Sequence, residues 1–232
     1  MSTGDIKSLP PSSLCGHTLS IEHYLATYCG VHIAEPAHKF IENFPKDFLE
    51  HTCPEAVELP AAFIVNEVND EFFVGIHLSH AMKQELSSHH DLRALLDHRE
   101  GLNAFLILAE EISHFHHWCN MTEAQRPLSR FDLELQAEIE KVIIGSLALI
   151  DTFGRSHIHQ LIQILFDESA FHGQLTNYIL ASRLAERFWK ENLKTLGPEL
   201  IFDTRLRRLL QHLSQLTGED KKRLISQTLS AA

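Results

Sequence analysis

The chain has 232 residues, of which 44% are hydrophobic, and this is enough to bury the core of a folded domain. Its 20 basic and 31 acidic residues give a formal net charge of -11, which argues against nonspecific binding to nucleic-acid phosphates. The four cysteines are widely spaced and include no C-x-x-C pair, so neither a zinc ribbon nor a disulfide framework is indicated and a reducing compartment is favoured.

The start of the chain predicts a protein that is neither exported nor embedded in a membrane. Residues 1–16 lack the basic start and the continuous apolar stretch of a signal peptide, and no later segment has about 18 uninterrupted apolar residues. We therefore expect a cytoplasmic protein. With two prolines among serines, residues 1–16 are typical of a flexible lead-in.

The first predicted helix lies in "LSIEHYLATYC", where apolar side chains recur at three- and four-residue spacing before Gly30. Short helical pieces follow, and they are interrupted by Pro36, Pro45 and Pro54.

A β-hairpin is predicted near residues 61–78. The runs "AAFIVNEV" and "EFFVGIHL" are β-branched and aromatic, and they flank Asn69-Asp70, a pair typical of tight turns. Because an isolated hairpin is only marginally stable, it must pack on helices or pair with another strand.

From Ser79 onward the apolar pattern is helical, and breaks fall at Pro127, Gly154, Gly197-Pro198 and Gly218. The sequence has no internal repeat and no long linker, so residues 17–232 are predicted to form one helical domain that contains the hairpin. The expected fold class is mostly α with a small β-hairpin (α+β). The predicted helices span 79–87, 90–97, 102–119, 128–151, 156–166, 168–194, 203–216 and 219–229.

The stretch "AEEISHFHHW", within the predicted helix 102–119, carries the candidate site. At about 100° per residue, His116 falls on the apolar face, whereas Glu110, His114 and His117 lie together on the opposite side. The i, i+4 spacing allows Glu110 and His114 to hold one ion, and the i, i+3 spacing allows Glu111 and His114 to do the same. A third ligand must come from another element.

The next predicted helix, 128–151, has a candidate for that ligand. Glu138 falls at the margin of its apolar face, whereas Glu140 points away. A carboxylate at the edge of a core needs a partner, because an unpaired charge there is costly. Available partners are His114 on the neighbouring antiparallel helix, Lys141, Arg130 or a metal ion. Glu110, His114 and Glu138 are therefore the first candidates for a metal site.

The segment "EEISH" resembles the H-E-x-x-H helix of gluzincin-type zinc metallopeptidases, and the resemblance covers about Phe63 to Lys141. Glu110 stands where the family has its first histidine. The resemblance implies a zincin-like scaffold in which Glu111 takes the general-base position and His114 is a metal ligand. It also implies that Glu134 or Glu138 is the downstream glutamate ligand.

The exchange of a histidine for Glu110 changes the expected chemistry. A site with two carboxylates and one imidazole is more anionic than the peptidase set and makes the metal a weaker Lewis acid. Such ligands suit iron or manganese at least as well as zinc. We therefore expect a protein of this scaffold to lack efficient peptidase activity and to serve a binding or regulatory role.

A second constellation keeps an active metalloenzyme open as the alternative. Glu168 and His172 lie at i, i+4 in "DESAFHGQL", and with Glu138 they loosely resemble a ferritin-like di-iron bundle, which uses E-x-x-H on two helices. Glu111 to His114 has that spacing, but Glu168 to His172 is one residue longer. On this alternative the protein is a metal-dependent hydrolase or a di-iron oxidase that uses Glu110 or Glu111, His114 and Glu138.

These acidic and histidine residues also have a purely structural interpretation. Glu134, Glu138, Glu140 and Lys141 can form a charged helix face with one salt bridge between helices, without any metal. Near the C-terminus, "RLRRLLQHL" and "KKRLI" concentrate basic residues. They predict either a docking surface for an acidic protein partner or a basic face that balances an acidic body.

Overall fold

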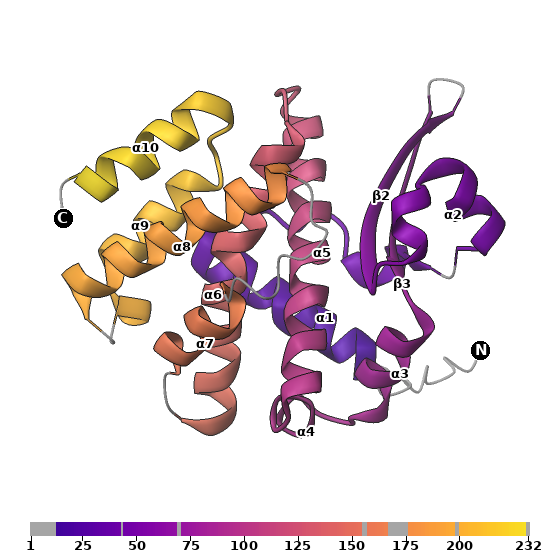
Figure 1. The fold of residues 1–232 in the computed structure, drawn as a ribbon, viewed down its shortest axis with the longest axis horizontal. Helices are drawn as coiled ribbons and strands as arrows, with labels where there is room; N and C mark the ends of the chain where they lie inside the picture. The colour runs from indigo at the N-terminus through magenta and orange to yellow at the C-terminus, as the bar shows by residue number, and fades with distance from the viewer. Residues whose placement is uncertain are drawn as a thin grey trace, which may run out of the picture.

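The computed structural model describes residues 13–42, 44–68, 71–154, 157–166, 176–197 and 200–230. It confirms the predicted class, because the described chain is mostly helical with a small sheet (Figure 1). The α-helices are α1 (Ser13–Tyr24), α2 (Lys46–Thr52), α3 (His80–Ser88), α4 (Leu92–Leu96), α5 (Arg99–Glu123), α6 (Arg130–Phe153), α7 (Ile158–Leu165), α8 (Thr176–Leu196), α9 (Thr204–Leu213) and α10 (Gly218–Ser230).

Helix α1 begins inside the segment 1–16 that its composition predicts as a lead-in, and it continues into a π-helical turn, Leu25–Cys29. Gly30 ends this turn in the left-handed conformation, which a residue without Cβ adopts at no steric cost.

The predicted hairpin forms, and it is part of a larger sheet than the sequence indicates. Strands β2 (Ala61–Val68) and β3 (Glu71–Leu78) pair antiparallel with Ala61 opposite Leu78. A two-residue strand β1 (Ile41–Glu42) pairs parallel with the other side of β3, which gives the order β1-β3-β2. The predicted turn at Asn69-Asp70 lies outside the described residues.

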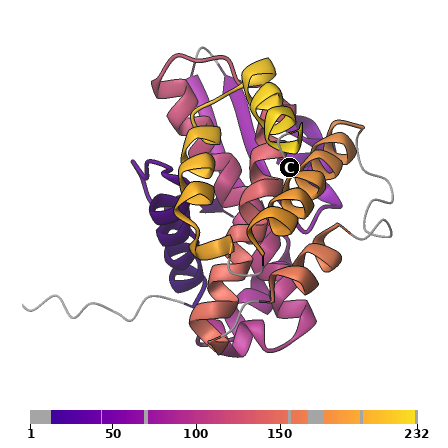
Figure 2. The same cartoon turned by 90° about the vertical axis from the view of Figure 1, so that its left-hand side faces the viewer.

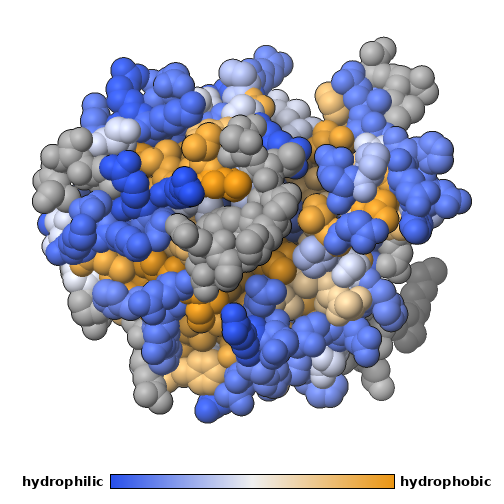
Figure 3. All heavy atoms as spheres, in the orientation of Figure 1, coloured by the Kyte–Doolittle hydropathy of each residue, from blue (hydrophilic) through white to orange (hydrophobic). Residues whose placement is uncertain are grey.

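Helices α5 and α6 run side by side through the middle of the molecule, with the sheet against α5 and with α8 against α6 (Figure 1). A second view shows α9 close to the π-helical turn that continues α1, and α10 close to α8 (Figure 2). Hydrophilic side chains cover most of the outline of the molecule, and hydrophobic side chains show mainly toward the middle of the face in Figure 3.

Local sequence fixes the start and the end of α6. Ser129 accepts a hydrogen bond from the backbone N–H of Asp132, whose carboxylate accepts one in return from the backbone N–H of Ser129, and together these bonds form a capping box. Gly154 ends the helix in the left-handed conformation. Between these caps α6 is buried on nearly all sides, and Trp189 of α8 donates a hydrogen bond to the Ile139 carbonyl oxygen, 3.2 Å away.

The close approach of α4 to the first turn of α5 depends on Gly101. A Cβ at this position would lie 1.9 Å from the carbonyl oxygen of Leu95, so the backbone would have to move. We expect Gly101→Ala to lower the free energy of unfolding by about 1–3 kcal/mol. Gly16 in α1 is the control, because its added Cβ would meet nothing within 4 Å beyond the adjacent backbone of its own helix, and Ala favours helix by up to about 1 kcal/mol. Urea unfolding of both variants measures the difference, and equal stabilities would contradict the proposed contact.

Candidate metal centre

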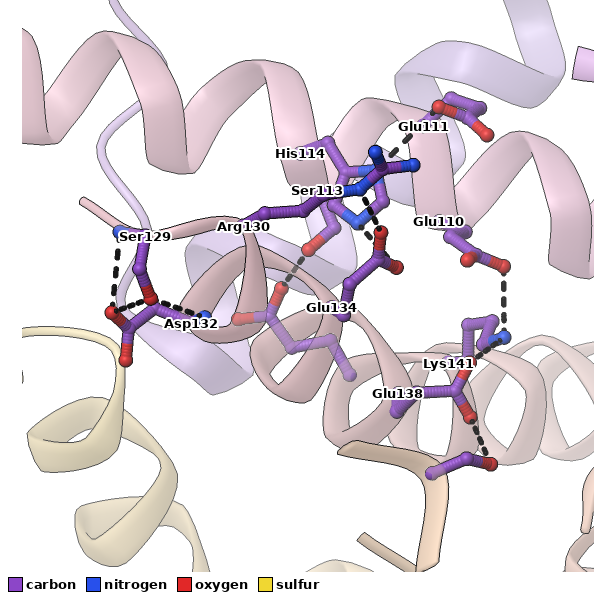
Figure 4. Close-up of polar contacts among 12 residues, drawn as sticks. Glu110, Glu111, Ser113, His114, Ser129, Arg130, Asp132, Glu134, Glu138 and Lys141 are labelled. Atoms are coloured by element: carbon purple, nitrogen blue, oxygen red, sulfur yellow. Dashed lines mark hydrogen bonds and ion pairs between the residues drawn. The ribbon is translucent and has the colours of Figure 1, made fainter. Parts of the chain in front are cut away.

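The facing sides of helices α5 and α6 carry acidic, basic and histidine side chains, which are buried between the two helices (Figure 4). The α5 helix contributes Glu110, Glu111 and His114, and α6 contributes Glu134 and Lys141. All five side chains are at most 13% exposed. We call these five side chains the seam. Buried charges need partners, so the arrangement of these side chains determines what the seam can bind.

One ligand atom each from Glu110, His114 and Glu134 lies within 4.8 Å of the other two. Two ligands that each sit at about 2 Å from a tetrahedral metal ion are about 3.4 Å apart, so small side-chain rotations close the gap. Among the described residues this is the group of three or more His, Cys, Asp and Glu side chains that has the geometry to hold a metal ion.

The orientation of His114 is the most informative feature of this group. Its Nδ1 lies 3.5 Å from a carboxylate oxygen of Glu111, and its Nε2 lies 3.6 Å from one of Glu134. Nε2 is buried and has no hydrogen-bond partner within the described part of the chain. Buried polar atoms are normally satisfied, and metal-binding histidines usually present their other ring nitrogen to a carboxylate. Both observations match a histidine that is set to receive a metal at Nε2.

The charges of the group explain its proton affinity. Burial alone lowers the pKa of His114, but Glu111, Glu134 and Glu110 outweigh this effect and raise the pKa to about 9. Burial raises the pKa of Glu134, although His114 opposes it. For Glu110, burial is outweighed by Lys141 and His114, which hold its pKa below the usual value. Without a metal, the imidazole therefore carries a proton at neutral pH and is a cation among carboxylates.

Glu138 does not take the position beside His114 that its spacing predicts. Its carboxylate pairs with the Lys141 ammonium and accepts a hydrogen bond from the Ser182 hydroxyl of α8 at 3.2 Å. Glu134, one helical turn earlier, lies beside His114 and is also 3.6 Å from Arg130. The choice between these glutamates depends on the register of α6 against α5, which helical periodicity does not encode.

Glu140 is also placed differently from its prediction. It is fully buried rather than directed away, and it accepts hydrogen bonds from Ser113 at 2.6 Å and Gln136 at 2.7 Å, and pairs with His117 at 3.0 Å. Burial raises its pKa, but these partners outweigh the effect and the pKa is lowered. Lys221 of α10 donates to Gln136 at 2.8 Å. The sequence does indicate this network, because the polar residues Ser113 and His117 on one helix, and Gln136 and Glu140 on the other, are each spaced i, i+4 and so lie on one side of their helix.

The remaining predicted residues fall into three groups. His116 is buried in the core as predicted, and its Nε2 lies 2.9 Å from Glu22. Glu168 and His172 lie outside the described residues. In the basic C-terminal segment several cations pair locally with acidic neighbours, for example Arg205 with Asp203 at 2.7 Å, and Lys221 is buried. A docking surface for a protein partner at this segment stays a prediction.

Within the described ranges, no helix is both long and apolar enough to cross a membrane. Comparisons with family models, curated proteins and solved structures found no match to this chain.

Proposed function

We propose that this protein binds one divalent metal ion through Glu110, His114 and Glu134, and that it serves as a binding or regulatory protein without peptidase activity. The observation that carries the proposal is the buried Nε2 of His114, which has no hydrogen-bond partner among the described residues and lies close to two carboxylates. A metal ion satisfies this nitrogen and both carboxylates at once.

The ligand types favour a particular group of metals. One imidazole and two carboxylates suit Zn²⁺, Fe²⁺ and Mn²⁺, whereas Mg²⁺ and Ca²⁺ prefer oxygen ligands only. For a fixed ligand set, Fe²⁺ and Zn²⁺ both bind more tightly than Mn²⁺. We therefore expect Zn²⁺ to bind more tightly than Mn²⁺, and Mg²⁺ to compete with neither at similar concentrations.

The seam supports a degenerate gluzincin-like scaffold. Two observations support this proposal: strands β2 and β3 pack on α5, and Glu134 on the following helix offers a carboxylate for the role that the resemblance gives to a downstream glutamate. Glu110 in place of a histidine adds negative charge next to the metal, which weakens its action as a Lewis acid. Glu111 lies against Nδ1 of His114, which supports a role in orienting the ring rather than in activating water. These features favour a metal-binding protein over the alternative of an active hydrolase.

The test is equilibrium dialysis of the purified full chain against Zn²⁺ and, separately, Mn²⁺, followed by elemental analysis. We expect one metal ion per chain in the wild type and in Glu138→Gln, and loss of the ion in His114→Ala and Glu134→Gln. Exposed Glu123 on α5 provides the control variant Glu123→Gln, which is expected to match the wild type. The pair Glu134→Gln and Glu138→Gln decides which glutamate is the ligand.

A wild-type protein that binds neither metal would overturn the proposal. Retention of a full equivalent of metal in both His114→Ala and Glu134→Gln would do the same, because the ion would then be bound elsewhere.

A further inference from the structure

A buried ammonium group lies directly beside the candidate metal centre. The Nζ atom of Lys141 lies 2.8 Å from the Oε2 atom of Glu110 and also contacts the Oε1 atom of Glu138. Lys141 is 5% exposed and Glu138 is 1% exposed. Glu110 is thus shared, because it belongs both to the group around His114 and to the ion pair with Lys141.

The surroundings of Lys141 resemble the second half of a dinuclear metal site. In such sites two cations lie about 3.5–4 Å apart and carboxylates bind both of them. Glu110 has this bridging position, and Glu138 is a carboxylate that has no part in the His114 group. Ser182 and Tyr178 of α8 hydrogen-bond to Glu138, so its carboxylate is held toward Lys141 from the far side.

We propose that Lys141 is a built-in second cation, which occupies the place of a second metal ion between Glu110 and Glu138 and thereby keeps the centre mononuclear. This inference rests on the proposed function, since it presupposes the metal ion at Glu110, His114 and Glu134. It assigns Lys141 as the residue that sets the number of metal ions bound.

The charges of the seam account for this role. Together with Glu110, Glu134 and neutral His114, one divalent ion gives a neutral ligand set, and Lys141 neutralises Glu138. A second divalent ion in the same space would be repelled by the ammonium. Replacement of Lys141 by a short neutral residue leaves two carboxylates, Glu110 and Glu138, facing an uncompensated space, and a buried pair of this kind strongly favours binding a cation.

The experiment is Mn²⁺ titration of the full chain, read by equilibrium dialysis and by electron paramagnetic resonance. The wild type is expected to bind one Mn²⁺ with the spectrum of an isolated ion, and Lys141→Ser to bind two with the spectrum of an exchange-coupled pair. The double variant Glu138→Gln/Lys141→Met is the matched control. It removes one charge of each sign, and it is expected to bind one Mn²⁺ like the wild type.

A second variant keeps the test decisive if Lys141→Ser does not fold. Lys141→Gln retains a hydrogen-bond donor but removes the positive charge that lies 2.8 Å from the shared Glu110 carboxylate. Loss of this repulsion is expected to tighten metal binding about tenfold. An unchanged dissociation constant in Lys141→Gln would overturn the inference. One Mn²⁺ in folded Lys141→Ser, or two in the wild type, would also overturn it, whereas a wild type without metal would overturn the proposed function itself.

Discussion

Raising the pH from about 6 to about 8 is expected to tighten Zn²⁺ binding about 100-fold, because each ion that binds must displace one proton from His114. The pKa of this imidazole is about 9 in the metal-free protein, so the ring is protonated throughout this pH range. A metal ion requires the neutral nitrogen at Nε2. The logarithm of the affinity therefore rises by about one for each pH unit and levels off near pH 9.

The proton can be counted directly. Calorimetric titration with Zn²⁺ at neutral pH, in two buffers that differ in ionisation enthalpy, is expected to show release of about one proton per ion bound. Exposed His159 on α7 offers the control His159→Gln, which is expected to release the same number. An affinity that is independent of pH over this range would show that His114 is not a ligand.

The raised pKa of His114 makes the metal-free protein less stable as the pH rises, whereas metal binding becomes tighter. A group whose pKa is raised from 6.5 to about 9 stabilises the fold fully below its unfolded pKa, and this stabilisation is lost as the pH rises through 9. The proton and the metal ion are thus alternative cations for the same carboxylates. The stabilisation gained by adding Zn²⁺ is expected to increase with pH across the same interval.

Glu140→Ala is expected to lower the free energy of unfolding by about 3–5 kcal/mol, because several buried polar groups lose their shared partner at once and a cavity is left. Glu140 is fully buried and is the shared acceptor for Ser113, His117 and Gln136. Its removal leaves three polar groups without their acceptor and opens a cavity between α5 and α6.

Urea unfolding measures this loss. The exposed α5 residue Glu123 gives the matched variant Glu123→Ala, which is expected to stay within about 0.5 kcal/mol of the wild type. A loss below about 1 kcal/mol in Glu140→Ala would contradict the role of Glu140 as the centre of a buried network.

Much of the fold could be predicted from local patterns. The two β-branched runs identified β2 and β3, and the end of α6 at Gly154 follows from the preference of glycine for left-handed helix ends. Strand β1 was not predictable in this way, because two residues carry no periodicity and Ile41 pairs with the distant Ile76.

The site was predictable in its α5 half. The spacing of Glu110 and His114 on one helix places both on one side, and the structure brings them together. The α6 half required the register between two helices, which brings Glu134 rather than Glu138 into the His114 group. The helical periodicity of α6 assumes that one side of the helix is buried and the other faces solvent, and it therefore directs Glu140 away from the core. In the structure α6 is buried on nearly all sides, and Glu140 with it.

A crystal structure of the protein loaded with Zn²⁺, with anomalous diffraction recorded at the zinc edge, tests the central claim most directly. We predict one anomalous peak at about 2.0–2.2 Å from Nε2 of His114 and from a carboxylate oxygen of both Glu110 and Glu134. A peak that has other ligands, or the absence of a peak between α5 and α6, would contradict the proposed metal centre.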